Sequence, residues 1–271
     1  MSQGEFLTAV AEEYASLDPL KVRIAAHQEL SEFPDDVEAA VLDGAECSPE
    51  HDVVDVGCGT AGFLRARSVA GHRGRLVGID TAPSAVEAAR AVPGTEGLLG
   101  SATELPLPGG AFDLLYARHM LYHVDDPAKA LAEFRRVLRP GGTAVTVVNH
   151  AEVVPHATGM VREEIARQGL DPGMRTVNGI HSDNLPPLLE AAFGNVRTTR
   201  YDNSLIFSEP GRLVEFSVAL LSVCGLPPEA PERPAVVSAL HDRIHAWFDG
   251  NRGPWRDPKG YTVSVSVRTD S

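Results

Sequence analysis

Short apolar runs alternate with amphipathic segments along the first 150 residues of the chain. The apolar runs have the length of strands, which we expect at residues 52–56, 75–80, 96–100, 112–117 and 143–148. The segments with helical periodicity predict helices at residues 5–16, 20–33, 34–42, 61–70, 83–91 and 126–138. Strands that alternate with helices at this spacing indicate βαβ units and a parallel sheet.

After residue 150 the strict alternation of strands and helices ends. Helices are expected at residues 153–165, 182–193, 213–223 and 235–248, and a strand is expected at residues 196–201. The last apolar pattern, residues 261–268, alternates Tyr and Val with Thr, Ser and Arg, which is typical of a half-buried strand. The sequence contains no internal repeat and no low-complexity tract.

The composition is that of a globular protein, and its 271 residues correspond to one large domain or to a core with a modest insertion. A formal net charge of −13 argues against nucleic acid or an anionic membrane as the main partner. The three cysteines, Cys47, Cys58 and Cys224, form no CxxC pair and support neither a disulfide framework nor a zinc site. With no basic segment ahead of an apolar one at the start, and no apolar stretch of membrane-spanning length, we expect a cytoplasmic protein.

The most informative segment is residues 53–62, VVDVGCGTAG, which places a GxGxxG pattern between a predicted strand and a predicted helix. Such glycines allow a backbone to approach a ligand closely, although several nucleotide-binding classes share the pattern. Asp55 lies two residues before the first glycine, where its carboxylate is expected to face the ligand crevice. Asp80 ends the second strand, at the spacing of the acidic residue that binds ribose hydroxyls.

The position of Asp55 favours one cofactor over another. A carboxylate beside the pyrophosphate of NAD would be electrostatically unfavourable, whereas one beside an ammonium and a sulfonium would be favourable. The sequence therefore favours S-adenosylmethionine. An NAD(P)-dependent oxidoreductase is the alternative, and the missing Tyr-x-x-x-Lys pair argues against it.

Five segments in the right order carry a family resemblance: residues 54–60, 77–80, 105–113, 118–124 and 136–142. Through them the chain resembles the class I S-adenosylmethionine-dependent methyltransferases, in the small-molecule branch with a ubiquinone-methyltransferase-like core. The resemblance implies an α/β fold with a Rossmann-like, doubly wound, seven-stranded sheet and a reversed last strand, which residues 261–268 would supply. It also implies N-terminal helices and a helical insertion before the last strand.

The resemblance further implies one catalytic domain with three parts. Residues 1–50 would form an N-terminal helical cover, and residues 51–150 the S-adenosylmethionine-binding core. Residues 151–271 would add a lid helix, the remaining core strands and a helical insertion that shapes the substrate pocket. Within these parts, residues 5–33 and 151–180 would cover the active site.

Carried over by position, the resemblance implies roles for a set of cofactor-binding residues. Gly57, Cys58 and Gly59 would approach the methionine part and the ribose, Asp55 the amino group, and Asp80 the ribose hydroxyls. The other implied contacts are Thr81, Ser101, Ala102 and Thr103 near the adenine, Arg118 and His123 near the sulfonium, and Tyr14 near the carboxylate. The family commonly has Asp where this chain has Ser101, and a hydroxyl accepts a hydrogen bond from the adenine amino group more weakly.

The chemistry itself asks little of the side chains. Transfer of a sulfonium methyl group is an in-line displacement that is limited by approach and alignment, and a base is needed only where the acceptor must lose a proton. His119, His150 and His156 are the candidates for that base, whereas Glu163, Glu164 or Asp183 could bind an amine acceptor. His119 and His123 are spaced like metal ligands on a helix, but no third ligand is evident, and no metal is expected.

The sequence thus predicts a methyltransferase that acts on an O, N or C atom of a small molecule, in natural-product biosynthesis on the strength of the resemblance. A cofactor-binding protein that performs no methyl transfer is a further alternative. The acceptor and the oligomeric state stay open at this point.

Overall fold

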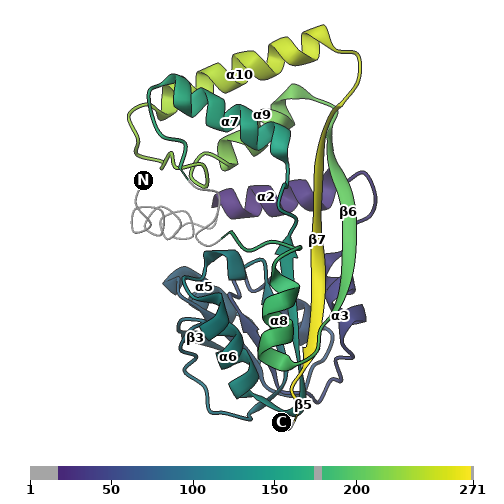
Figure 1. Cartoon of the computed structure of the whole chain (residues 1–271). Coiled ribbons are helices and arrows are strands. Elements are labelled where there is room, and N and C mark those ends of the chain that lie inside the picture. The colour runs from purple at the N-terminus through teal and green to yellow at the C-terminus, as the bar shows by residue number, and fades with distance from the viewer. Residues whose placement is uncertain (1–17, 174–178, 270–271) are drawn as a thin grey trace. The chain divides into compact units, whose positions relative to one another are not determined.

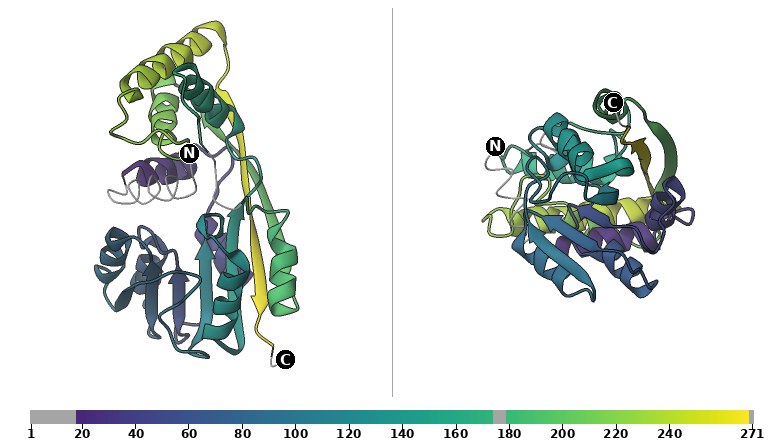
Figure 2. Two further views of the ribbon diagram at one scale, coloured as in Figure 1. Left: turned by 60° about the vertical axis from the view of Figure 1, so that its left-hand side comes forward. Right: turned by 90° about the horizontal axis from the view of Figure 1, so that it is seen from below.

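The computed structural model of the protein describes residues 18–173 and 179–269. Within them, a seven-stranded sheet has the order β3-β2-β1-β4-β5-β7-β6 (Figure 1). The strands are β1 (Val53–Val56), β2 (Leu76–Asp80), β3 (Thr95–Leu99), β4 (Phe112–Arg118), β5 (Leu138–Asn149), β6 (Arg197–Phe207) and β7 (Trp255–Val267). Strands β1 to β5 run parallel, whereas β7, yellow in Figures 1 and 2, runs antiparallel to β5. This topology confirms the predicted Rossmann-like sheet with a reversed last strand.

The helices begin where the sequence offers proline or a capping side chain. They are α2 (Asp18–Glu29), α3 (Val37–Gly44), α4 (Gly62–Val69), α5 (Pro83–Arg90), α6 (Pro127–Val137), α7 (Pro155–Arg167), α8 (Leu185–Phe193), α9 (Pro210–Ala219) and α10 (Arg233–Gly250). Asp126 caps α6, because its carboxylate accepts a hydrogen bond from the Lys129 N–H at 3.0 Å. None of the described helices combines the length and the apolar character that crossing a bilayer requires.

The described chain divides into two compact units. The sheet unit comprises residues 36–151, 179–201 and 261–269, and the helical unit comprises residues 18–35, 152–173 and 202–260. Strands β6 and β7 each contribute residues to both units. The three-part division expected from the sequence stays a prediction.

The sheet unit has an apolar core on each face of the sheet. Helices α6 and α8 lie on one face (Figure 1). Their Phe134 and Leu189 belong to the same core as Val54 and Leu115 of the sheet. On the other face, α3 and α4 pack against the sheet, with Phe63 of α4 among the fully buried side chains. Helices on both faces explain why the strands read as continuous apolar runs, as expected for a buried parallel sheet.

The helical unit has a core of its own. Apolar side chains of α7, α9 and α10, among them Ile165, Phe216 and Ile244, pack together with Leu205 and Phe207 from the second half of β6. The apolar periodicity after residue 150 therefore predicted real helices, of which α7, α9 and α10 pack on one another while α8 packs on the sheet.

Two strands begin earlier than their sequence pattern indicates. Strand β5 begins at Leu138 instead of residue 143, so residues 139–142 lie within the strand, where Gly142 O accepts a hydrogen bond from the Arg268 N–H. Strand β7 begins at Trp255 instead of residue 261. The sequence pattern did not indicate a strand at its start, because Asp257 and Lys259 are charged. In the structure, Asp257 accepts hydrogen bonds from the first N–H groups of α7, and Lys259 pairs with Asp35.

An ion pair on α6 fixes the loop that follows β3. Arg136 donates two hydrogen bonds to Glu133, at 2.6 and 2.7 Å, and also binds the carbonyl oxygens of Leu105 and Leu107. Glu133 in turn accepts the Leu105 N–H at 2.8 Å. The bidentate geometry distinguishes this pair from ordinary surface ion pairs. The hydrogen bonds from Arg136 hold the pKa of Glu133 below its usual value, against the opposing effect of burial.

This arrangement predicts a pH effect on stability. A carboxyl whose pKa is lowered in the folded state adds stability above its unfolded pKa of about 4.3 and loses that contribution as the pH falls through the folded pKa. We expect Glu133→Gln to lower the free energy of unfolding at neutral pH, and the deficit to shrink below about pH 4. Urea unfolding from neutral to acid pH measures it. Glu87→Gln removes an exposed pair with Arg90 at the same i, i+3 spacing and is the control; an equal effect of both variants would contradict the assignment.

Candidate functional site

The carboxyl ends of β1, β2 and β4 meet at one edge of the sheet, where parallel α/β sheets bind their ligands. The turn after β1 has three residues in the left-handed region within five positions, Gly57 (φ +72°), Gly59 (φ +53°) and Ala61 (φ +56°). The N–H groups of Gly57 and Cys58 both donate to Ile79 O, at 2.7 and 3.1 Å, and tie the turn to β2. The turn therefore has the compact form that the glycine pattern predicted.

Asp80 is held at the edge of this turn by backbone groups. Its two carboxylate oxygens accept the Gly59 N–H at 3.0 Å and the Ala82 N–H at 2.9 Å. Each oxygen retains capacity for a further hydrogen bond from a ligand hydroxyl. The neighbouring Thr81 is exposed. The carboxylate is thus oriented before any ligand arrives.

Asp55 differs from its expected position, because its side chain is fully buried rather than open to a crevice. Oδ2 accepts a hydrogen bond from Arg118 Nη2 at 2.8 Å, whereas Oδ1 has no hydrogen-bond partner among the residues that the structure describes. Burial raises the pKa of the Asp55 carboxyl above its usual value, Arg118 opposes this, and the Asp80 and Glu38 carboxylates add to it. A buried oxygen without a donor is costly, so the site favours a positive charge nearby.

The segment after β4 packs directly on the glycine turn. The Arg118 guanidinium lies over the Phe63 ring, 4.6 Å from its centroid, while it pairs with Asp55. A Cβ atom on Gly57 would lie 2.7 Å from the Met120 Cβ, which is closer than real side chains approach. Gly57 is therefore required both by its backbone angle and by this packing, and Arg118 and Met120 flank the turn from β4.

Glu38 is a site residue that sequence reasoning missed. It lies in the first turn of α3, and its Oε1 is 3.9 Å from the position that a Cβ on Gly62 would take. It faces the start of α4 and acts on the Asp55 carboxyl through its charge. Only tertiary packing brings α3 to this place, so no local signal in the sequence could have revealed it.

The residues after β3 present hydroxyl groups rather than a carboxylate. Ser101 Oγ lies 2.9 Å from Thr103 Oγ1 and accepts the Thr103 N–H at 3.2 Å. The side chain of Ala102 is buried in the core, as is that of Cys58, whose thiol pKa is raised by burial. Ala102 and Cys58 can therefore offer a ligand only backbone atoms.

The three candidate bases occupy different places. His119 follows β4 and His150 follows β5, with His150 Nδ1 2.9 Å from Ser182 Oγ. His156 belongs to the helical unit, where its Nδ1 lies 3.1 Å from Arg256 O. His123 ends a 3₁₀ turn, η1 (Leu121–His123), so the helical His119–His123 spacing does not exist in the structure. Tyr14 lies outside the described residues.

The carboxylates considered for an amine acceptor already have cationic neighbours. Glu163 and Glu164 bind Arg243 at 2.7 and 2.8 Å, and Asp183 lies 3.3 Å from Arg200. Among the residues that the structure describes, no three His, Cys, Asp or Glu side chains are grouped to hold a metal ion.

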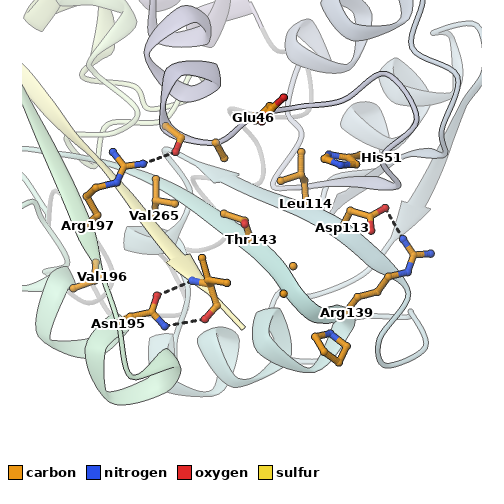
Figure 3. A pocket seen from close by; sticks show the side chains of 16 residues that line it. Glu46, His51, Asp113, Leu114, Arg139, Thr143, Asn195, Val196, Arg197 and Val265 are labelled. Atoms are coloured by element: carbon orange, nitrogen blue, oxygen red, sulfur yellow. Dashed lines mark hydrogen bonds and ion pairs between the residues drawn. The ribbon is translucent and has the colours of Figure 1, made fainter. Parts of the chain in front are cut away.

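A cavity of about 680 Å³ lies at the opposite, amino edge of the sheet unit (Figure 3). Its polar side chains already bind protein groups: Arg139 binds Asp113, Arg197 binds Gly44 O, and Asn195 binds the backbone of Val267. The cavity also lacks a glycine turn or an unpartnered buried carboxylate among its lining residues. The glycine turn, Asp55 and Asp80 lie instead at the carboxyl edge, which is therefore the candidate site.

Comparisons with known proteins agree with this geometry. Residues 54–146 match the family model described as "Methyltransferase domain". The uncharacterised methyltransferase YcgJ of Bacillus subtilis is 32% identical over 117 residues, which cover 41% of this chain and 46% of that protein. Its crystal structure superposes with a TM-score of 0.59 at 20% identity, covering 86% of this chain and 98% of that one.

One further relative and one further solved structure differ in what their names describe. A probable tocopherol O-methyltransferase of Oryza sativa is 33% identical over 136 residues, covering 47% of this chain and 37% of that protein. The crystal structure of the [4+2]-cyclase SpnF has a TM-score of 0.62 at 18% identity, covering 97% of this chain and 96% of that one, which shows a shared fold.

The strand order and the matched segment, which contains the glycine turn, both agree with a methyltransferase domain. Residues 54–146 of the chain are thus similar to methyltransferase domains. The match to the curated relatives reported above covers less than half of their length.

The glycine turn yields a test of where the ligand lies. A Cβ on Gly59 would meet no protein atom within 4 Å, so Gly59→Ala should cost only the left-handed backbone penalty of about 1 kcal/mol. The added methyl group would point into the space at the turn, and we expect binding of S-adenosylhomocysteine to weaken by at least tenfold in calorimetry.

Gly94→Ala is the matched control, because Gly94 (φ +74°) also has open space at its Cβ and precedes β3. It should show a similar loss of stability and unchanged ligand affinity. If both variants bound the ligand equally well, the turn after β1 would not be the binding surface.

Proposed function

We propose that the protein transfers a methyl group from S-adenosylmethionine to a small-molecule acceptor. The observation that carries this proposal is the buried Asp55–Arg118 pair with the unpartnered Asp55 Oδ1 beneath the glycine turn. Asp80 and Glu38 both act on Asp55 through their charge, so two further carboxylates lie near the Asp55–Arg118 pair. This balance attracts a sulfonium and an ammonium and disfavours the phosphates of NAD.

The residues present fit this cofactor. The backbone at Gly57 and Gly59 would lie against its methionine and ribose parts, and Asp80 would accept the ribose hydroxyls. Asp55 has no accessible surface, so it would act on the ammonium from beneath the turn, as a charge and as the anchor of Arg118. The hydroxyls of Ser101 and Thr103 would border the adenine, with His123 near the sulfonium. When bound, the cofactor supplies a methyl group that is already activated for displacement.

The protein's own contribution is then alignment and the exclusion of water. The oriented Asp80 carboxylate and the rigid turn fix one reaction partner without further ordering, which is how proximity lowers the barrier of a two-substrate reaction. Sequence similarity to a tocopherol O-methyltransferase supports a small organic acceptor, and we infer a role in secondary metabolism from the same kinship.

A second possibility is cofactor binding without methyl transfer. The fold is shared with a protein described as a [4+2]-cyclase, so the fold alone does not decide the reaction. Transfer of label from S-adenosyl-[methyl-³H]methionine to an acceptor separates the two functions.

Cofactor identity is tested by calorimetry on the full chain. We expect binding of S-adenosylmethionine and S-adenosylhomocysteine and none of NAD or NADP. Asp80→Asn should weaken S-adenosylhomocysteine binding by about 1.5–3 kcal/mol, the range for hydrogen bonds to a charged group.

Asp126→Asn serves as the control, because Asn caps a helix as well as Asp does and the affinity should stay unchanged. Comparable affinity for NAD, or an Asp80→Asn variant that binds S-adenosylhomocysteine like the wild type, would refute the assignment of the site.

A further inference from the structure

A pair of histidines on α10 has no part in the proposed function. Residues 241–245 have the sequence His-Asp-Arg-Ile-His, so His241 and His245 are four positions apart within one continuous helix (Figure 1). Residues at this spacing are neighbours on the same face of a helix. The helical spacing that the structure does not form between His119 and His123 is therefore present here.

The two imidazole rings lie against each other. Their centroids are 4.2 Å apart and their planes are inclined by 32°. His241 is exposed and His245 is partly exposed, so solvent reaches both side chains. The buried positions of α10 are Val236, Leu240 and Ile244, which belong to the core of the helical unit. The histidines lie outside this packed face, and the core does not require their rings to approach each other.

A carboxylate lies beside one of the two imidazoles. Asp242 Oδ1 is 3.3 Å from His241 Nδ1. When Nδ1 carries the proton, the second ring nitrogen, Nε2, presents its electron pair. Histidines that bind metal ions commonly donate their other ring N–H to a carboxylate, which fixes the tautomer and orients the ring. Asp242 thus favours the tautomer of His241 whose Nε2 can coordinate a metal ion.

The pair suits a metal ion better than two protons. If both imidazoles were protonated, two like charges would lie one helical turn apart, which is destabilising. In the neutral state, each ring offers one nitrogen electron pair, and rotation about the broad χ2 torsion can direct both toward one ion at about 2.0–2.1 Å. Imidazole nitrogen is a ligand for zinc, nickel and copper, whereas magnesium and calcium prefer oxygen.

The charged neighbours of the pair also favour a cation. Arg243 lies between the two histidines in sequence, but its charge is paired with Glu164 of α7 at 2.8 Å. Asp249 follows His245 by one turn and is exposed, and the described part of the chain gives it no ion pair. Asp242 and Asp249 therefore add a negative potential along this side of α10, which attracts a divalent ion.

We propose that His241 and His245 form a binding site for a divalent transition-metal ion of the zinc, nickel and copper group, with Asp242 as a positioning residue. One ring nitrogen of each histidine binds the ion, and water completes its coordination. The described chain groups no third protein ligand with the pair, so the ion is exchangeable and differs from a structural zinc held by four side chains. The site belongs to the helical unit and does not depend on methyl transfer.

Calorimetry with Ni²⁺ on the full chain tests the site. The variants are His241→Gln and His245→Gln, because Gln is a better helix former than His. Each should weaken Ni²⁺ binding by about 10²-fold, since the second histidine of the pair binds an ion that the first already holds. Electron paramagnetic resonance with substoichiometric Cu²⁺ should show two imidazole nitrogens on copper in the wild type and one in either variant.

Asp242→Asn tests the positioning role. It should weaken Ni²⁺ binding by about tenfold, at the lower end for an outer carboxylate, and leave both imidazole nitrogens on copper. Asp242→Glu, which keeps a carboxylate, should bind Ni²⁺ more tightly than Asp242→Asn does. An Asp242→Asn variant with the affinity of the wild type would overturn this role.

His181→Gln is the matched control. Asp183 Oδ2 lies 3.5 Å from His181 Nδ1, but no histidine lies four residues away in sequence, so the affinity for Ni²⁺ should stay unchanged. Equal Ni²⁺ affinity of the wild type and both α10 variants would overturn the site, as would a copper spectrum that the two substitutions leave unaltered. Displacement of Ni²⁺ by excess Mg²⁺ would make carboxylates the ligands and overturn the assignment to the imidazoles.

Discussion

The buried ion pair between Asp55 and Arg118 joins the two strands on which the site is built. Asp55 is fully buried in β1, and Arg118 ends the neighbouring strand β4. Two charges removed from water are stabilising only when their geometry is good and their other polar atoms are satisfied. One oxygen of Asp55 and Nε of Arg118 are not satisfied by protein. Burying these two unsatisfied atoms costs free energy, and a charged ligand that binds beside them can offset that cost.

The local sequence was sufficient for the parts of the structure that depend on local chemistry. The apolar run before Gly57, the left-handed glycines and Asp80 at a strand end are features of neighbouring residues, and the structure places them as expected. Glu38 and the Asp55–Arg118 pair depend on which elements pack together, so the sequence could name Arg118 but not its partner. The early part of β7 escaped notice because Asp257 and Lys259 look like surface residues until their buried partners are known.

Preorganisation explains why so few side chains are needed at the turn. Asp80 is oriented by two backbone N–H groups, and the turn is fixed by hydrogen bonds to Ile79 O and by Met120. The entropy of ordering these groups is lost during folding, and a ligand then gains hydrogen bonds without that cost. The same reasoning makes Gly57 indispensable in two ways, since a side chain there would strain the backbone and displace Met120.

The side chains at the carboxyl edge of the sheet differ in kind on the two sides of the Arg118–His119 peptide bond. On the β1 and β2 side lie carboxylates and a guanidinium, which suit a charged ligand. Beyond β4 lie His119, Tyr261 and Tyr201, whose rings contact one another in sequence. Two consecutive side chains can serve these two environments only if the chain departs from a regular strand, and the left-handed backbone at His119 provides that departure. The strain at one residue is thus the structural cost of directing His119 toward Tyr261 while Arg118 pairs with Asp55.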